Sequence, residues 1–151
     1  YRCEHMAGAF AALDDPEAPL RPALRRFFDA LVADTLGDPP RDAPRAGAPR
    51  GGAPREGRPQ GCFMVNATTE RAACDPDVAA RVRDNLAAME GVLERAVGRA
   101  QARGEVAAAK DARALARFLA MAVQGMRVAG AANPSRAALR DMVAVTLAAL
   151  D

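Results

Sequence analysis

Residues 75–104 read DPDVAARVRDNLAAMEGVLERAVGRAQARG, and they carry the clearest helical signal in the chain. Their apolar positions are spaced three or four residues apart, which is the period of an amphipathic α-helix. Asp75 suits the N-cap, Pro76 suits the first helical position, and Gly104 suits the position just past the end. We therefore expect a long helix from Pro76 to Arg103. Its apolar stripe consists of Val78, Val82, Leu86, Met89, Leu93, Ala96 and Ala100.

The stretches on either side of this helix also follow helical spacing rather than the alternation of a strand. Asp14-Asp15-Pro16 and Asn133-Pro134-Ser135 separate neighbouring helices, and Asp111 is a further candidate N-cap. An all-α bundle of about six helices follows from this order. The additional helices are expected over residues 1–13, 19–35, 61–73, 111–131 and 135–150.

Residues 37–60 interrupt the helical pattern with a stretch rich in Pro, Gly and Arg. Six Pro and five Gly fall among these 24 residues, a composition that predicts a flexible, extended loop. The loop has five Arg against three acidic residues, so it carries the whole net charge of +2. The helical part is therefore neutral and lacks the basic excess of a nucleic-acid-binding face. The loop itself is either a solvated linker or a weak contact for phosphates.

The scarcity of His and Cys limits the chemistry that the chain can perform. A single His excludes a zinc site built on several His, and no acid/base constellation is visible. We therefore expect neither an enzyme nor a bound metal or other cofactor. Three Cys without a CxxC motif favour a reducing compartment, which we expect to be the cytoplasm. The sequence contains no run of 18 apolar residues, so we expect no membrane span.

The last two expected helices, over residues 111–131 and 135–150, are apolar on two sides. A helix that is apolar on two sides must be buried on two sides, and six helices offer too little cover for both. We therefore expect a homodimer in which each chain contributes these two helices to a four-helix arrangement. The alternative is that the abundance of Ala merely blurs the polar faces. The candidate interface residues are Gly125, Val128, Ala129, Leu139, Met142, Val143, Thr146 and Leu150.

Short motifs follow one another along residues 61–151. They are GCFMVN at 61–66, DPDV at 75–78, AQARGE at 100–105, ALARFL at 114–119, QGMRV at 124–128 and LRDMV at 139–143. Their order and spacing resemble the C-terminal domain of TetR/AcrR-type transcriptional regulators. Residues 1–36 share with that family only the helix order and the run PLRPALRRFF at 19–28.

This resemblance implies a regulator, usually a repressor, that leaves its operator DNA when a small molecule binds. In such a protein an N-terminal helix-turn-helix domain reads the operator. The C-terminal helical domain dimerises through its last two helices and holds the effector. Residues 1–14 would then be the remnant of the helix that joins a missing DNA-binding domain, and residues 15–151 would form the ligand-binding and dimerisation domain. Operator DNA would be contacted only through that missing domain, and no membrane would be involved.

The resemblance also implies a mostly apolar cavity inside each subunit, and several large, adaptable side chains are available to line it. With few charges on the inward faces, the effector should be a neutral or weakly polar small molecule, oriented by Asn66, Glu70 or Gln124. The alternative is that these side chains fill the core of a helical dimerisation or scaffold module that binds no ligand. The candidate ligand-binding residues are Phe27, Phe28, Met64, Asn66, Glu70, Leu86, Met89, Phe118, Met121 and Gln124.

Overall fold

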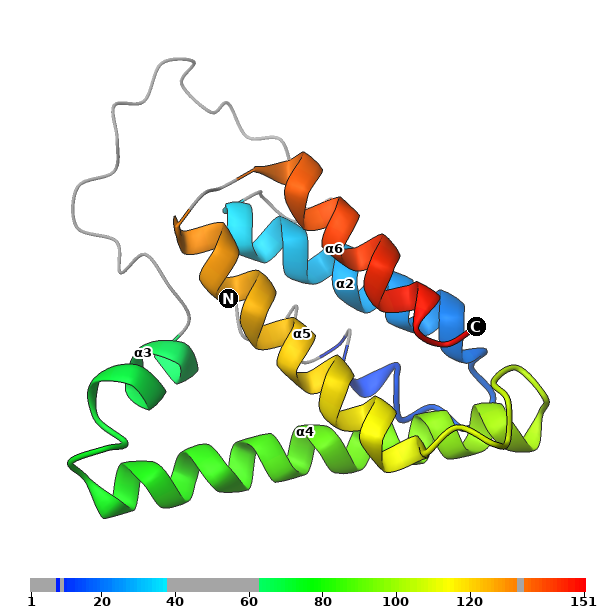
Figure 1. Cartoon of the computed structure of the whole chain (residues 1–151), viewed down its shortest axis with the longest axis horizontal. Helices are drawn as coiled ribbons and strands as arrows, with labels where there is room; N and C mark the ends of the chain where they lie inside the picture. The colour runs from blue at the N-terminus through cyan, green and yellow to red at the C-terminus, as the bar shows by residue number, and fades with distance from the viewer. Residues whose placement is uncertain (1–7, 9, 38–62, 133–134) are drawn as a thin grey trace.

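The computed structural model describes residue 8 and residues 10–37, 63–132 and 135–151 of the chain. Within these ranges it contains five α-helices and no strand, which confirms the all-α prediction. Of the expected helix over 1–13 the structure describes residue 8 and residues 10–13, and of the expected loop over 37–60 it describes only residue 37. The helices are α2 (Leu20–Leu36), α3 (Phe63–Glu70), α4 (Pro76–Ala102), α5 (Ala112–Ala132) and α6 (Arg136–Ala148) (Figure 1).

The long helix α4 begins and ends where its capping residues predict. The Asp75 carboxylate accepts hydrogen bonds from the backbone N–H groups of Asp77 and Val78, at 3.1 and 3.2 Å. Pro76 occupies the first turn, where its missing N–H costs nothing. Gly104 has a φ of 75°, in the left-handed region that favours glycine just past a helix. These signals are local in sequence, which is why the bounds of α4 could be predicted closely.

The helix expected over residues 61–73 is shorter in the structure, because α3 ends at Glu70. Beyond Glu70, the backbone N–H groups of Arg71 and Ala72 both donate to the Ala67 carbonyl, at 3.1 and 3.0 Å. The N–H of Cys74 then donates to the Arg71 carbonyl at 3.0 Å. The chain thus tightens into turns that lead directly to the start of α4.

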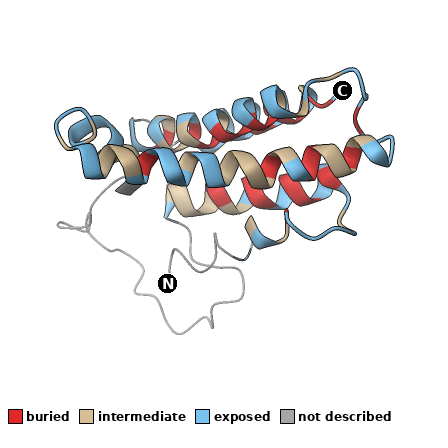
Figure 2. Cartoon of the chain, turned by 90° about the horizontal axis from the view of Figure 1, so that it is seen from below, coloured by how far each residue is buried: buried red, intermediate tan, exposed pale blue. Residues whose placement is uncertain are grey.

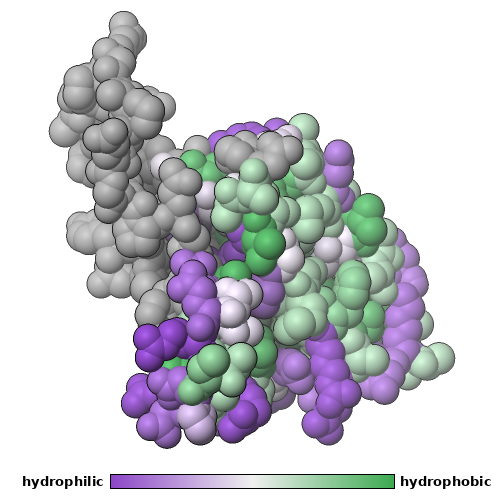
Figure 3. All heavy atoms as spheres, turned by 60° about the vertical axis from the view of Figure 1, so that its left-hand side comes forward, coloured by the Kyte–Doolittle hydropathy of each residue, from purple (hydrophilic) through white to green (hydrophobic). Residues whose placement is uncertain are grey.

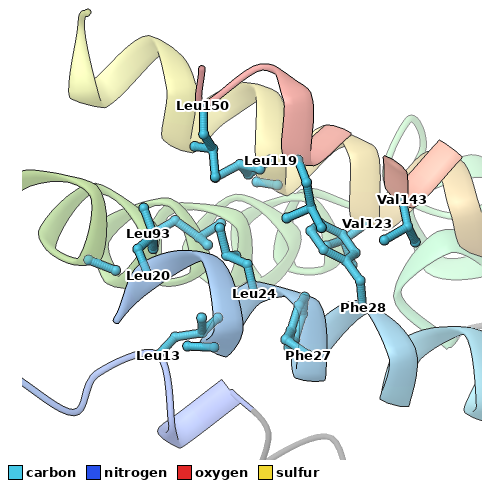
Figure 4. Close-up of a cluster of buried hydrophobic side chains, with 14 of the residues drawn as sticks. Leu13, Leu20, Leu24, Phe27, Phe28, Leu93, Leu119, Val123, Val143 and Leu150 are labelled. Carbon is cyan, nitrogen blue, oxygen red and sulfur yellow. The ribbon is translucent and has the colours of Figure 1, made fainter. Parts of the chain in front are cut away.

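The central helix of the bundle is α5, which contacts α2, α3, α4 and α6. In Figure 1, α2, α5 and α6 follow the same diagonal and α4 crosses below them. Their buried side chains form one hydrophobic core, part of which is shown in Figure 4. Within this core the rings of Phe27 and Phe28 meet edge to face, with centroids 5.5 Å apart. Other large core residues are Leu13, Leu24, Leu31, Leu93, Leu119, Val123, Met126 and Leu147.

The two halves of α4 are buried to different extents. In the N-terminal half only Val82 is buried, and α3 packs against this helix (Figure 1). Figure 2 shows that exposed and half-buried residues make up much of the surface along the bundle. The N-terminal half of α4 is therefore only lightly covered, whereas the C-terminal half belongs to the core. The buried residues of the C-terminal half are Leu93, Ala96, Val97 and Ala100.

Candidate functional site

The candidate pocket residues on α2 and α3 lie in different surroundings. Phe27 and Phe28 are buried within the hydrophobic core, and Figure 4 shows both rings among other core side chains. Asn66 is half-buried on α3, and Glu70 at the end of that helix is exposed. The side chain of Met64 lies outside the described part of the chain. The two Phe therefore contribute to the stability of the subunit, and Asn66 is the described polar candidate on α3 that has partial cover.

The candidate pocket residues on α4 and α5 also fall into two groups. Leu86 and Met89 are half-buried on α4, and Met89 packs against the core. Gln124 is half-buried on α5. Phe118 and Met121 are 45% and 48% exposed, on the side of α5 that faces away from the core. Since α3 contacts both α4 and α5, the half-buried candidates lie on three helices that meet one another.

A small hollow that is open to solvent lies elsewhere, where the start of α2 meets the loop after α4 and the end of the chain. Its volume is about 10 Å³, far below the roughly 300–1,000 Å³ that pockets for small ligands usually span. None of the candidate pocket residues contributes to it. Its lining residues are Leu20, Arg21, Glu105, Val106 and Leu150.

The candidate interface residues divide between the surface and the core. Gly125 and Val128 are exposed on α5, while Ala129 and Met142 are half-buried. The remaining four are buried within the chain, at or just beyond the core-facing side of α6, where they stabilise its hydrophobic core. These four residues are Leu139, Val143, Thr146 and Leu150.

Apolar residues that are exposed or half-buried form a stripe on α5 and a stripe on α6. On α5 the stripe positions are spaced by 3, 4 and 3 residues, and on α6 by 4, 3 and 4, so each set lies on one side of its helix. Because α5 and α6 contact each other, the two stripes lie on neighbouring helices. We call them together the outer face, and it comprises Phe118, Met121, Gly125 and Val128 of α5, Ala138, Met142 and Val145 of α6, and Ala149 at the C-cap of α6.

The outer face contains every large hydrophobic side chain that is strongly exposed in the described residues. Val128 is 50% exposed and Val145 is 70% exposed, in addition to Phe118 and Met121. A Cβ added at Gly125 would meet no atom within 4 Å, so the backbone there is open to a close approach. Figure 3 shows apolar side chains gathered over a broad area of one side of the molecule. Val145 is not among the candidate interface residues predicted from the sequence, although it lies three residues after Met142 on the same side of α6.

Two arginines at the side of α5 form ion pairs within the subunit. Arg117 Nε lies 3.5 Å from Glu90 Oε2 on α4. Arg127 Nη1 lies 3.4 Å from Asp34 Oδ2 on α2, and both of these side chains are largely buried. These ion pairs connect α5 to α4 and α2, whereas the residues of the outer face include no charged side chain.

The described residues offer little for other kinds of site. They contain no group of three or more His, Cys, Asp or Glu side chains that could hold a metal ion. Cys74 is a free, exposed thiol. Among these helices, none combines the length and the apolar character needed to cross a membrane.

Comparison with known proteins gives one family and one similar repressor. Residues 47–146 match the family described as the tetracyclin repressor-like, C-terminal domain. The HTH-type transcriptional repressor ComR of Escherichia coli (strain K12) is 33% identical over 87 residues, which cover 58% of this chain and 41% of ComR. The aligned region thus spans less than half the length of that repressor, and no solved structure matches the chain. Since the family match covers more than half of the residues, this chain belongs to the tetracyclin repressor-like C-terminal domain family.

Proposed function

We propose that this chain is the small-molecule-sensing and dimerisation part of a cytoplasmic transcriptional regulator that represses until its effector binds. Two observations support this proposal, namely the exposed apolar surface of the outer face and the membership of the chain in the tetracyclin repressor-like family. Because ComR is a repressor of which the aligned region covers only 41%, we assign the reading of operator DNA to a part of the regulator outside residues 1–151.

Dimerisation through the outer face follows from the cost of leaving it in water. Burying apolar surface gains about 25 cal/mol per Å², so a stripe with Phe118, Met121, Val128 and Val145 favours association. A second copy of the chain is the partner that fits best, because the face carries no charge that would be repelled across a two-fold axis. Gly125 would let two α5 helices approach closely.

The proposed effector site lies where α3 meets the lightly covered half of α4 and the middle of α5. Half-buried side chains from all three helices would line it, namely Asn66, Leu86, Met89 and Gln124. Two of these are apolar and two are uncharged amides, which suits a neutral or weakly polar molecule. Phe27 and Phe28 would support the site from the core rather than touch the effector.

Thermal melting in the presence of neutral, hydrophobic small molecules tests the sensing function. A ligand that binds only the folded state should raise the melting temperature with increasing concentration. Met89→Trp should abolish that increase, because the larger side chain would fill the site.

Ala88→Trp is the matched control, since Ala88 is the exposed neighbour of Met89 on α4. It should leave the ligand response intact. A ligand whose effect survives Met89→Trp would contradict the placement of the site. A dimer that responds to no ligand would favour the alternative of a scaffold module.

A further inference from the structure

Three arginines, two on the C-terminal half of α4 and one at its C-cap, hold the segment that leads into α2. Arg95, Arg99 and Arg103 are spaced four residues apart and therefore lie on one side of the helix. They face residues 13–19, which we call the lead-in segment. This segment lies between the helical residues Phe10 and Ala11 and the start of α2.

The first two arginines bind the beginning of the lead-in segment. Arg95 donates hydrogen bonds to the Asp14 carboxylate from both Nε and Nη2, with donor–acceptor distances of 3.1 to 3.3 Å. Arg99 Nη2 donates to the backbone carbonyl of Leu13 at 2.7 Å, and its Nη1 lies 3.9 Å from Asp14 Oδ1. The Leu13 side chain is buried in the core, so this end of the segment is fixed by polar and apolar contacts together.

The third arginine binds the end of the segment and continues to α2. Arg103 donates to the carbonyls of Pro16 and Ala18, both at 3.0 Å, and to Glu105 Oε1 at 2.5 Å. The other oxygen of Glu105 accepts the backbone N–H of Leu20 at 2.8 Å. This bond supplies the N-terminal cap that α2 lacks, because its own N-cap residue is a proline without a capping side chain.

These contacts attach the lead-in segment firmly to α4, so that it is not an independent loop. Three of its carbonyl oxygens are satisfied by arginines that lie more than 80 residues away in sequence. The helix α4 is about 40 Å long at 1.5 Å per residue, and its other half borders the proposed effector site. One helix therefore reaches from that site to the lead-in segment.

We propose that Arg95, Arg99 and Arg103 form a clasp that couples α4 to the lead-in segment, so that a displacement of α4 is passed to the residues that precede it. The sensing role of this coupling rests on the proposed function, but the coupling itself does not. We class the three arginines as positioning residues, because the contacts that define the clasp are all made within the chain. The clasp gives an effector bound beside α4 a route to the N-terminal residues of the chain.

The distance between spin labels on the two sides of the clasp tests this coupling directly. Labels are placed at the exposed residues Ala11 and Ala88, in a background with the three native Cys changed to Ser. Labelled chain is diluted with unlabelled chain so that distances within one subunit dominate. The clasp predicts one narrow distance distribution for the wild type. It predicts a distribution at least twice as broad when all three arginines are changed to Gln.

Two controls separate coupling from a general loss of structure. Labels at Ala88 and Ala131, which span α4 and α5 without involving the clasp, should keep their distance in both proteins. Arg81→Gln combined with Arg83→Gln, at exposed arginines of the same helix, should leave the Ala11–Ala88 distribution narrow. If the triple variant fails to fold, Arg99→Gln alone should still broaden the distribution.

The outcomes are decisive without any ligand. A distribution that is broad in the wild type, or that stays narrow in the folded variant, would overturn the clasp. A clasp that behaves as expected in a chain that binds no ligand would leave the coupling standing and count against the sensing function alone.

Discussion

The two sides of α5 are built from similar residues and yet have opposite surroundings. On the inner side Leu119, Val123 and Met126 are at most 2% exposed. On the outer side Met121 and Val128 are about half exposed, although they are of comparable size and polarity. The other helices that the structure describes cover only the inner side of α5. The apolar periodicity of a helix therefore predicts how many of its sides are apolar, whereas the fold determines which of those sides is buried within the chain.

The largest expected effect separates the inner and outer sides by their contribution to subunit stability. Leu119→Ala should lower the free energy of unfolding by about 2–5 kcal/mol, because it leaves a cavity in the core. Met121→Ala should change it by less than about 1 kcal/mol at chain concentrations low enough to dissociate dimers. Urea denaturation of both variants measures the difference. Equal losses would mean that both sides of α5 are covered within one subunit.

Two glycines on α5 give a second, smaller test of the same contrast. A Cβ at Gly130 would lie 2.1 Å from Thr35 Cγ2, whereas a Cβ at Gly125 would meet nothing within 4 Å. Gly130→Ala should therefore cost about 1–3 kcal/mol through overpacking. Gly125→Ala should be neutral or should stabilise the monomer by up to about 1 kcal/mol, because Ala favours the helix. Thermal unfolding of dilute samples distinguishes them, and a tolerant Gly130 would refute the close approach of α2 and α5.

A still smaller effect is expected at Glu105, which lies outside α5 and whose contribution to stability depends on pH. The hydrogen bond from Arg103, and secondarily that from the Leu20 N–H, holds the pKa of Glu105 below its ordinary value of about 4.5, although partial burial opposes this. The stability from Glu105 is therefore complete above that ordinary value and is lost as the pH falls through the lower pKa of the folded state. Glu105→Gln should cost less than about 1 kcal/mol at neutral pH, because the amide oxygen can still accept one hydrogen bond while the charge that favours Arg103 is lost and is partly screened by solvent.

The difference between Glu105→Gln and the wild type should shrink in acid, as measured by unfolding at several pH values. A difference that is the same at every pH would show that the charge of Glu105 plays no part in holding α2.

Sequence patterns predicted the helices better than they predicted the surfaces. The bounds of α4 followed from Asp75, Pro76 and Gly104, because caps act on residues adjacent in the chain. The two apolar sides of α5 and α6 were also visible as periodicity. The periodicity did not indicate which of the two apolar sides faces inward. Leu139 and Val143 were therefore expected at an interface, but they lie in the core.

The long-range contacts left no sequence signal at all. Arg99 and Arg103 bind backbone carbonyls, which every residue has, and their partners are more than 80 residues away. The contact of Gly130 with Thr35 likewise depends on how α2 and α5 cross. The spacing of residues in the sequence indicates only contacts within one helix. The contacts of the clasp could therefore be identified only in the three-dimensional structure.

The oligomeric state of the chain tests the central claim, that the outer face pairs two subunits. Sedimentation equilibrium at micromolar concentration should give a dimer for the wild type. The double variant Met121→Glu, Val128→Glu should give a folded monomer, because it places charges in the interface. The control Ala131→Glu, at an exposed position of α5 off the outer face, should remain dimeric. A folded wild-type monomer, or a double variant that dimerises as well as the wild type, would contradict the account.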